Sequence, residues 1–304
     1  MKMTTSSIRQ NSTKAWLIAS RPKTLSGAAV PVLIGLAQAY TDSKQYQGDC
    51  FSWTAAAICM IFALLMQIDA NLINDFFDYT KGTDDNKTRL GPPRACAQGW
   101  VSPRAMKHAI AMTTCLACAC GLPLVFFGGL EMILVGVVCV VFCFLYTTHL
   151  SYIGLGDLLV VIFFGIVPVC ITYYIQLHTC TWQVFIGSLA CGIAIDALLL
   201  VNNFRDRFTD RTAGKNTLAV KLGERKTLQL YLATGCTAFL MGCTYWAGGH
   251  PMAFLFPFAY LALHILTYTN IARIRRGKEL NVCLGQTARN ILVYGLTVTI
   301  GLLL

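Results

Sequence analysis

Two short clusters of polar residues stand out in this chain, because acidic side chains are otherwise scarce. Only 14 of the 304 residues are Asp or Glu. The first cluster contains Asn71, Asn74, Asp75 and Asp78, and Asp84 follows shortly after it. Asn71, Asp75 and Asp78 are spaced i, i+4 and i+7, which predicts one shared helix face. This cluster therefore predicts a helix end that presents several oxygen atoms together.

A second cluster repeats the pattern 131 residues later. It contains Asn202, Asn203, Asp206 and Asp210. Asn202, Asp206 and Asp210 are spaced i, i+4 and i+8, again on one helix face. The shared element Asn-x-x-x-Asp indicates an internal repeat. We therefore expect a single domain over residues 1–304, built from two halves at roughly 14–150 and 151–304.

Carboxylate and amide oxygens at two helix ends are suited to a hard cation. Proteins commonly hold Mg²⁺ with one or two carboxylates and the phosphates of a substrate. Basic residues follow both clusters: Lys81, Arg89 and Arg94 after the first, and Lys215 after the second. Carboxylates, Mg²⁺ and cations together can bind a diphosphate and neutralise it as it leaves. The alternative, ordinary solvated charges, fits any single Asp better than it fits two spaced copies.

Three further acidic residues lie deeper in apolar sequence. Asp69 and Asp196 precede the two clusters, and an ionisable group at such depth usually faces a cavity or a partner. Both a functional role and a buried structural role stay open for them. Asp157 follows a Gly-Leu-Gly turn and could face the same cavity as Tyr146. His149, in the same turn region, fits a solvated loop residue better than a catalytic one.

The elements that must position these residues are hydrophobic. Hydrophobic residues make up 56% of the chain and charged residues 12%, against about 25% charged in an ordinary soluble domain. The mean hydropathy is +0.58. This composition excludes disordered, collagen-like and small disulfide-rich proteins. It predicts an all-α polytopic membrane protein. A membrane-spanning helix needs about 20 mostly apolar residues, and we expect nine, at 25–40, 53–74, 108–127, 131–147, 155–176, 183–201, 227–247, 252–272 and 286–304.

The basic residues agree with nine alternating spans and a cytoplasmic N-terminus. Of the 24 Lys and Arg residues, 22 fall in segments that this topology places inside, as the positive-inside rule requires. The net charge of +10 therefore reports membrane orientation, and its division among several loops argues against nucleic-acid binding. The first 20 residues lack the apolar segment of a signal peptide. The 14 Cys residues lack paired metal-ligand spacing, so we expect them to pack within helices.

The two clusters resemble the aspartate-rich motifs of the UbiA superfamily of intramembrane aromatic prenyltransferases. The first reads Asn71-x-x-Asn74-Asp75-x-x-Asp78-x-x-Lys81-Gly82-x-Asp84, and the second reads Asn202-Asn203-x-Arg205-Asp206-x-x-x-Asp210-x-x-x-Gly214-Lys215-x-Thr217-Leu218-Ala219. The extended second motif is similar to the branch of the family that prenylates 1,4-dihydroxy-2-naphthoate in menaquinone synthesis. Other matches to that branch are Arg21-Pro22-Lys23-Thr24-Leu25, Gly91-Pro92-x-Arg94 and Tyr152-Ile153-Gly154-Leu155-Gly156-Asp157.

The resemblance implies a fold and a reaction. The fold is nine transmembrane helices around a central cavity, with a polar cap on the cytosolic side and an opening toward the lipid bilayer. The reaction transfers a polyprenyl chain from polyprenyl diphosphate to 1,4-dihydroxy-2-naphthoate and needs Mg²⁺. CO₂ and diphosphate are lost, and demethylmenaquinone forms. The implied location is a bacterial plasma membrane.

The resemblance also implies roles for individual residues. The implied metal ligands are Asn71, Asp75, Asp78 and Asp84 in the first motif, and Asn202, Asp206 and Asp210 in the second. The implied substrate-binding residues are Asn74, Lys81, Arg89, Arg94, Asn203, Lys215 and Lys23. Tyr146 and Asp157 are expected to orient the aromatic ring or to accept its proton. The first motif has Tyr79 where related enzymes carry a third ligand, and Asp78 or Asp84 is expected to substitute for it.

Two alternatives remain open at this point. Within the same family, the acceptor could be 4-hydroxybenzoate, homogentisate or a chlorophyll precursor, although the extended second motif argues against these. Outside it, intramembrane carboxylates and an internal repeat also occur in transporters and channels. An odd number of spans puts both copies of the motif in one orientation at one surface, which fits a transporter less well.

Overall fold

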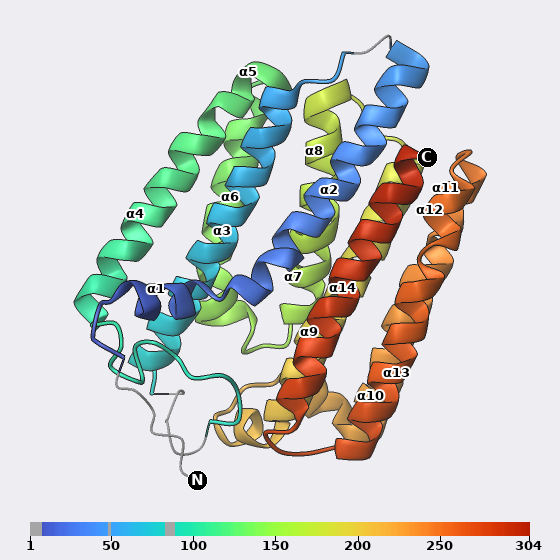
Figure 1. Ribbon diagram of the computed structural model, residues 1–304. Helices are drawn as coiled ribbons and strands as arrows, with labels where there is room; N and C mark the ends of the chain where they lie inside the picture. Colours follow the sequence, from blue (N-terminus) through green and yellow to red (C-terminus); the bar gives the residue numbers. More distant parts are fainter. Residues whose placement is uncertain (1–7, 48–49, 83–88) are drawn as a thin grey trace.

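The computed structural model describes residues 8–47, 50–82 and 89–304. Over these ranges the chain consists of helices joined by turns, and it contains no strand. The expected all-α class is therefore confirmed. The long helices run side by side in one bundle, and α14 ends at the opposite end of the bundle from α1 (Figure 1).

The first half of the chain supplies six α-helices. They are α1 (Thr13–Ser20), α2 (Leu25–Asp42), α3 (Trp53–Thr80), α4 (Pro103–Gly121), α5 (Val125–Gly128) and α6 (Glu131–Leu145). Short 3₁₀ turns, η1 (Pro22–Thr24) and η3 (Leu122–Leu124), lead into α2 and α5, and two π-helical turns, η2 (Ser43–Gln47) and η4 (Tyr146–Leu150), continue α2 and α6. A proline in the first turn of η1 and η3 lacks the N–H that a longer α-helix would need there.

The second half supplies the remaining helices. They are α7 (Gly156–Val161), η5 (Ile162–Ile166), α8 (Val167–Leu177), α9 (Trp182–Thr212), α10 (Leu218–Met241), α11 (Cys243–Ala247), α12 (Pro251–Leu255), α13 (Phe258–Ile274) and α14 (Leu280–Leu303). The π-helical turn η5 joins α7 to α8, so these three elements cross the bundle as one broken rod.

Seven helical segments of the described chain are long and apolar enough to cross a membrane. They are Thr13–Gln45, Trp53–Thr80, Pro103–Gly128, Glu131–Leu150, Gly156–Leu177, Trp182–Thr212 and Pro251–Ile274. Six of them contain one of the nine expected stretches, and Gly156–Leu177 contains all but the first residue of the stretch at 155–176. The other two expected stretches, 227–247 and 286–304, overlap α10 and α14, which are helices of 24 residues each. Polar residues such as Glu224 and Arg289 keep the mean hydropathy of these two helices below that of the seven segments.

Hydroxyl side chains mark the beginnings of the long helices. Ser52 accepts a hydrogen bond from the Ala55 N–H at the start of α3, and Thr181 accepts one from the Val184 N–H at the start of α9. Such N-caps satisfy backbone donors that the helix itself leaves free. Both helices continue well past their apolar stretches, to residues 80 and 212. The two polar clusters therefore lie in the last turns of α3 and α9.

Glycines allow the helices around the centre of the bundle to pack closely. A Cβ atom on Gly35 of α2 would lie 2.7 Å from the Val169 carbonyl oxygen of α8. A Cβ atom on Gly192 of α9 would lie 2.6 Å from the Val161 carbonyl oxygen of α7. Small residues at such contacts are typical of helix packing in membranes, where close van der Waals contact drives association.

The helices that carry the two clusters finish at the same end of the bundle. In Figure 1, α3 and α9 both end at the bottom, where the 89–102 loop and the connection between α9 and α10 also lie. Helix α1 lies across this end, transverse to the bundle. We call it the polar end of the bundle. The fold thus brings together two clusters that are 131 residues apart in the sequence.

Candidate functional site

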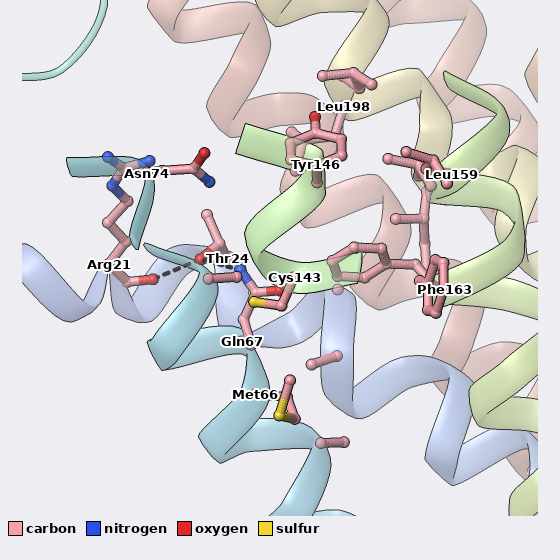
Figure 2. A pocket seen from close by; sticks show the side chains of 18 of the residues that line it. Arg21, Thr24, Met66, Gln67, Asn74, Cys143, Tyr146, Leu159, Phe163 and Leu198 are labelled. Atoms are coloured by element: carbon pink, nitrogen blue, oxygen red, sulfur yellow. Dashed lines mark hydrogen bonds between the residues drawn. The ribbon is translucent and has the colours of Figure 1, made fainter. Parts of the chain in front are cut away.

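A cavity of about 1440 Å³ opens between the two halves of the chain. Its lining comes from α2, α3 and α6 of the first half and from α7, α8, α9 and α14 of the second. Its polar side chains gather near the polar end of the bundle, and the rest of the wall is apolar. Figure 2 shows this contrast: Arg21, Asn74 and Gln67 occupy one part of the view, and Phe163 and Leu159 occupy another.

Both sequence clusters contribute to the polar part of the cavity. The residues from them that line it are Asn74, Asp78, Asn202, Asn203, Asp206 and Asp210. Asp78 and Asp210 come from different halves, yet their charges act on each other. The charge of Lys215 acts on both of them. The expected meeting of the two motifs at one site is therefore present in the fold.

The first cluster is rotated relative to the expected helix face. Asn74 and Asp78, four residues apart, line the cavity, whereas Asn71 and Asp75 do not. Asn71 is buried and donates from Nδ2 to the Ser20 carbonyl at 3.0 Å and to Thr24 Oγ1 at 2.9 Å. The structure thus places Asn71 in the contact between α3 and the junction of α1 and α2. Of the three residues predicted to share one helix face, only Asp78 therefore lines the cavity.

Asp75 holds the loop that follows the first cluster. Its two carboxylate oxygens accept hydrogen bonds from the Ala95 N–H at 2.8 Å and from the Cys96 N–H at 2.9 Å. The Asp75 side chain is only 1% exposed. These two bonds fix the backbone next to Arg94, the residue directly before Ala95. Arg94 Nη2 donates to Asp78 Oδ2 at 2.9 Å. Asp75 therefore positions Arg94 against Asp78 at the cavity wall.

A buried arginine organises the second cluster. Arg205 is 1% exposed and donates to both carboxylate oxygens of Asp206. It also donates to Asn202 Oδ1 at 2.7 Å and to Asn281 Oδ1 at 2.8 Å. Asn281 in turn donates to the Leu90 carbonyl at 2.8 Å. Arg205 thus ties α9, α14 and the loop of the first half into one network.

The structure also explains why a glycine precedes the two prolines in this loop. A Cβ atom on Gly91 would lie 2.7 Å from Arg205 Nη2. Any larger residue would push the guanidinium away from Asp206. The match at Gly91-Pro92-x-Arg94 therefore has a physical cause, because it lets one loop contact both clusters at once.

The remaining predicted cations divide between the cavity and its surroundings. Lys23, Arg89, Arg94 and Lys215 line the cavity. Burial lowers the pKa of Arg89 to about 10, so it stays positively charged at neutral pH. Lys81 is placed elsewhere: its Nζ donates to the Thr148 carbonyl at 2.7 Å and lies 4.3 Å from the Tyr152 ring centre. Asp84 lies outside the described residues.

One cation of the site was missed by the sequence reasoning. Arg21 lines the cavity at the junction between α1 and η1, with a left-handed backbone conformation (φ 49°). Its Nη2 atom is buried and has no hydrogen-bond partner among the described residues. Figure 2 shows its side chain reaching toward the part of the pocket that holds Asn74. The run Arg21-Pro22-Lys23 carries the signal for Arg21, because it places a second cation two residues before Lys23.

Tyr146 and Asp157 lie near each other beside the cavity. Tyr146 lines the cavity from the π-helical turn η4. Asp157 does not line the main cavity but lines a small adjoining pocket, together with Tyr146, Asn203 and Lys215. Asp157 therefore does not face the main cavity as expected, but it lines the small pocket next to Tyr146.

The donor set fits a hard divalent cation completed by a substrate. Among the described residues, no three His, Cys, Asp or Glu side chains form a metal site by themselves. The cavity instead offers separate oxygen donors from both halves, which suits Mg²⁺ because this ion is commonly held by one or two carboxylates and substrate phosphates. Asp78 and Asp206 already accept hydrogen bonds from arginines, but a carboxylate has about four lone-pair sites in all.

Comparison with known proteins agrees with this geometry. The profile of the UbiA prenyltransferase family matches residues 28–290. The 1,4-dihydroxy-2-naphthoate octaprenyltransferase of Escherichia coli (strain K12) is 38% identical over 224 residues, which cover 70% of this chain and 70% of that protein.

Solved structures are also similar. The apo structure of a UbiA homologue from Aeropyrum pernix K1 aligns with a TM-score of 0.66 at 16% identity, over 90% of this chain and 96% of that one. A UbiA homologue from Archaeoglobus fulgidus, bound to GPP and Mg²⁺, aligns with a TM-score of 0.58 at 15% identity, over 94% and 99%. These likenesses show the fold, and with the seven candidate spans they show a multi-pass membrane protein.

Proposed function

Because this chain belongs to the UbiA prenyltransferase family, we propose that it transfers a polyprenyl chain from polyprenyl diphosphate to 1,4-dihydroxy-2-naphthoate. CO₂ and diphosphate leave, and the product is the hydroquinone form of demethylmenaquinone, a precursor of menaquinone. The observation that carries this proposal is a single cavity with two chemically distinct parts. One part gathers oxygen donors and cations from both halves of the chain, and the other is a long apolar chamber.

The polar part is suited to the diphosphate. Asn74 and Asp78 on one wall, and Asn202, Asp206 and Asp210 on the other, are the residues that would hold Mg²⁺. When bound, the ion supplies positive charge to the diphosphate oxygens as the C–O bond weakens. Arg21, Arg89, Arg94 and Lys215 line the same region and stabilise the negative charge that develops on the leaving group.

The apolar part is suited to the prenyl chain and to the allylic cation. Side chains such as Met66, Phe163 and Leu198 line it from three different helices (Figure 2). A dry wall of this kind keeps water from capturing the cation before the aromatic ring reacts. Tyr146 stands where it could orient the ring of the acceptor, because it lines the cavity from η4.

The cavity also reaches lipid-facing helix surfaces. Leu122 beside α4, and Ile133 and Val137 on α6, line the cavity and are 61%, 47% and 54% exposed. We infer that the prenyl chain enters between these elements from the bilayer. In this arrangement α10 and α14 complete a set of nine spans, the polar end faces the cytoplasm, and the protein lies in a bacterial plasma membrane.

A reconstituted assay tests the reaction and its metal requirement together. The purified protein in liposomes receives 1,4-dihydroxy-2-naphthoate, a polyprenyl diphosphate and Mg²⁺. Diphosphate is measured directly, and the hydroquinone product is oxidised by air and measured as demethylmenaquinone. We expect equal amounts of the two products with Mg²⁺ and neither with excess EDTA. Turnover only with 4-hydroxybenzoate or homogentisate would keep the fold and change the acceptor. Full activity in EDTA would contradict the role given to the oxygen donors.

A further inference from the structure

A buried carboxylate, Asp196, and a half-buried one, Asp157, lie behind Tyr146, and the roles assigned above do not use Asp196. Asp196 is 6% exposed in the middle of α9. Its Oδ1 atom and the Oδ1 atom of Asp157 are both buried and have no hydrogen-bond partner among the described residues. Buried polar atoms of this kind are rare in folded proteins, and each calls for an explanation.

The packing of α7 against α9 brings the two carboxyl groups to one level of the bundle. The two helices run in opposite directions, and Gly192 of α9 packs on Val161 of α7 so closely that a Cβ atom would lie 2.6 Å from the Val161 carbonyl oxygen. Asp196 follows Gly192 by four residues, and Asp157 precedes Val161 by four. One helical turn from the glycine contact, the two aspartates therefore lie at the same level of the two helices, and the charge of Asp157 acts on Asp196.

Two carboxyl groups in such a site hold a proton between them. Two negative charges close together in an apolar interior repel each other, so a neighbouring pair of carboxyl groups can share one proton. Such a pair can accept a proton and can also donate one. Among its neighbours, Lys215 lines the pocket beside Asp157, and Lys221 donates to the Ile153 carbonyl at 3.0 Å. The charges of Asp78 and Asp210 act on Tyr146 from the cavity side.

Tyr146 connects this pair to the cavity. The small pocket beside Asp157 has a volume of about 10 Å³, which is about the space of one water molecule. Tyr146, Ser151, Asn203 and Lys215 line both this pocket and the main cavity. The Tyr146 hydroxyl lies 3.7 Å from the position of a Cβ atom on Gly156, the residue directly before Asp157. A hydroxyl at this place can pass a proton from the cavity side to the carboxyl side.

We propose that Asp157 and Asp196 form a proton-exchanging pair that serves a ring hydroxyl of the aromatic acceptor through Tyr146. This inference rests on the proposed function. The hydroxyl proton moves to the pair as the new C–C bond forms, and the electron pair of the breaking C–O bond leaves with diphosphate. The prenylated ring is left as a ketone. CO₂ then departs, its bonding electrons pass to the ring oxygen, and the pair returns the proton, so no net proton is consumed.

Asn substitutions test the pair, because they keep the shape of the side chain and remove its proton exchange. We expect Asp157→Asn and Asp196→Asn each to lower kcat at least tenfold at pH 7, while KM for polyprenyl diphosphate changes less than twofold. Raising the pH increases the ionised fraction of the acceptor tenfold per unit until it is fully ionised. An acceptor that is already ionised does not need the pair to take its proton. The ratio of variant to wild-type kcat should therefore rise toward one between pH 7 and pH 9.

A matched control separates proton exchange from structural damage. Asp69 is a fully buried carboxylate within a helix, and its Oδ1 atom, like those of the pair, has no hydrogen-bond partner among the described residues. Its Oδ2 atom accepts from Thr114 Oγ1 at 2.7 Å, and Asp69 does not line the cavity. The ratio of kcat for Asp69→Asn to kcat for the wild type should not change with pH. If Asp157→Asn or Asp196→Asn fails to fold, Tyr146→Phe provides the same pH comparison.

Two results would contradict the proposed proton exchange by Asp157 and Asp196. One is wild-type kcat in both Asn variants, and the other is a kcat ratio that stays constant with pH. Failure of the proposed function is a separate result, because wild-type protein would then make no naphthoate product. In that case the same variants are compared with whichever aromatic acceptor the wild type does prenylate.

Discussion

Single residues in the first cluster differ in what they do, although the sequence presents them as equivalent. Asp75 is bonded to two backbone N–H groups, and Asp78 faces the cavity beside Arg94. Both carboxylates fit an aspartate-rich motif equally well on paper. Their roles separate only when the contacts of each oxygen atom are known.

Asp75→Ala and Asp78→Asn should therefore fail in different ways. Asp75→Ala leaves the Ala95 and Cys96 N–H groups buried without acceptors, at a cost of about 1–3 kcal/mol each. We expect a clearly lower unfolding temperature in detergent for this variant. Asp78→Asn should unfold like wild type and lose turnover at least a hundredfold. A stable but inactive Asp75→Ala would instead make Asp75 a metal ligand.

Arg21 offers a second test at this scale, because its guanidinium faces the polar part of the cavity. A hydrogen bond to a charged group contributes about 1.5–3 kcal/mol, which corresponds to roughly ten- to hundredfold in binding. Arg21→Gln should raise KM for polyprenyl diphosphate by that factor and leave KM for the naphthoate nearly unchanged. Lys14→Gln, an exposed change on α1, is the control. If Arg21→Gln and Lys14→Gln have the same KM for polyprenyl diphosphate, Arg21 does not bind this substrate.

The residue chemistry of the site could be predicted from the sequence, but its orientation could not. The repeat of Asn-x-x-x-Asp is sufficient to predict that two helix ends meet around one ligand. The end of α3 is polar on two adjacent faces, however, with Asn71 and Asp75 on one and Asn74 and Asp78 on the other. The sequence pattern contains no information on which face meets the cavity, because that depends on how α3 packs on α1 and on the 89–102 loop.

At the scale of helices, hydropathy located the elements well and their ends less well. Each expected apolar stretch lies within or across a helix of the structure. Helices α3 and α9 extend beyond their apolar parts because the polar clusters themselves continue the helix. Breaks such as η5 escape a hydropathy profile, since Ile162–Ile166 is as apolar as its surroundings.

The contact between α7 and α9 provides a prediction for this scale. Gly192→Ala would place a methyl group 2.6 Å from the Val161 carbonyl oxygen and 2.9 Å from its Cα atom, so the helices must separate. Overpacking of this kind costs about 1–3 kcal/mol, and we expect a lower unfolding temperature. Gly136→Ala on α6 meets nothing within 4 Å and should not lower it. Equal unfolding temperatures for the two variants would show that α7 and α9 can move apart freely.

The whole molecule has a direction, because both motifs lie at one end of the bundle. Cys180 is exposed in the turn between α8 and α9, at the opposite end from the motifs. If the polar end faces the cytoplasm, a membrane-impermeant thiol reagent should label Cys180 in intact cells. Peptide mass spectrometry identifies the labelled residue, and Cys180→Ser should remove the signal. Labelling of Cys180 only after cell lysis would reverse the proposed orientation.

The exposed cavity edge at Leu122, Ile133 and Val137 changes how the kinetics of this protein should be expressed. If one substrate enters from the bilayer, its effective concentration is a surface density, counted per lipid rather than per litre. Adding inert phospholipid at constant substrate should then slow the reaction by surface dilution, although nothing in the aqueous phase has changed. Alkyl-chain detergents would compete with the prenyl chain for the apolar cavity. Rates measured in micelles and in liposomes therefore cannot be compared at equal bulk concentrations of substrate.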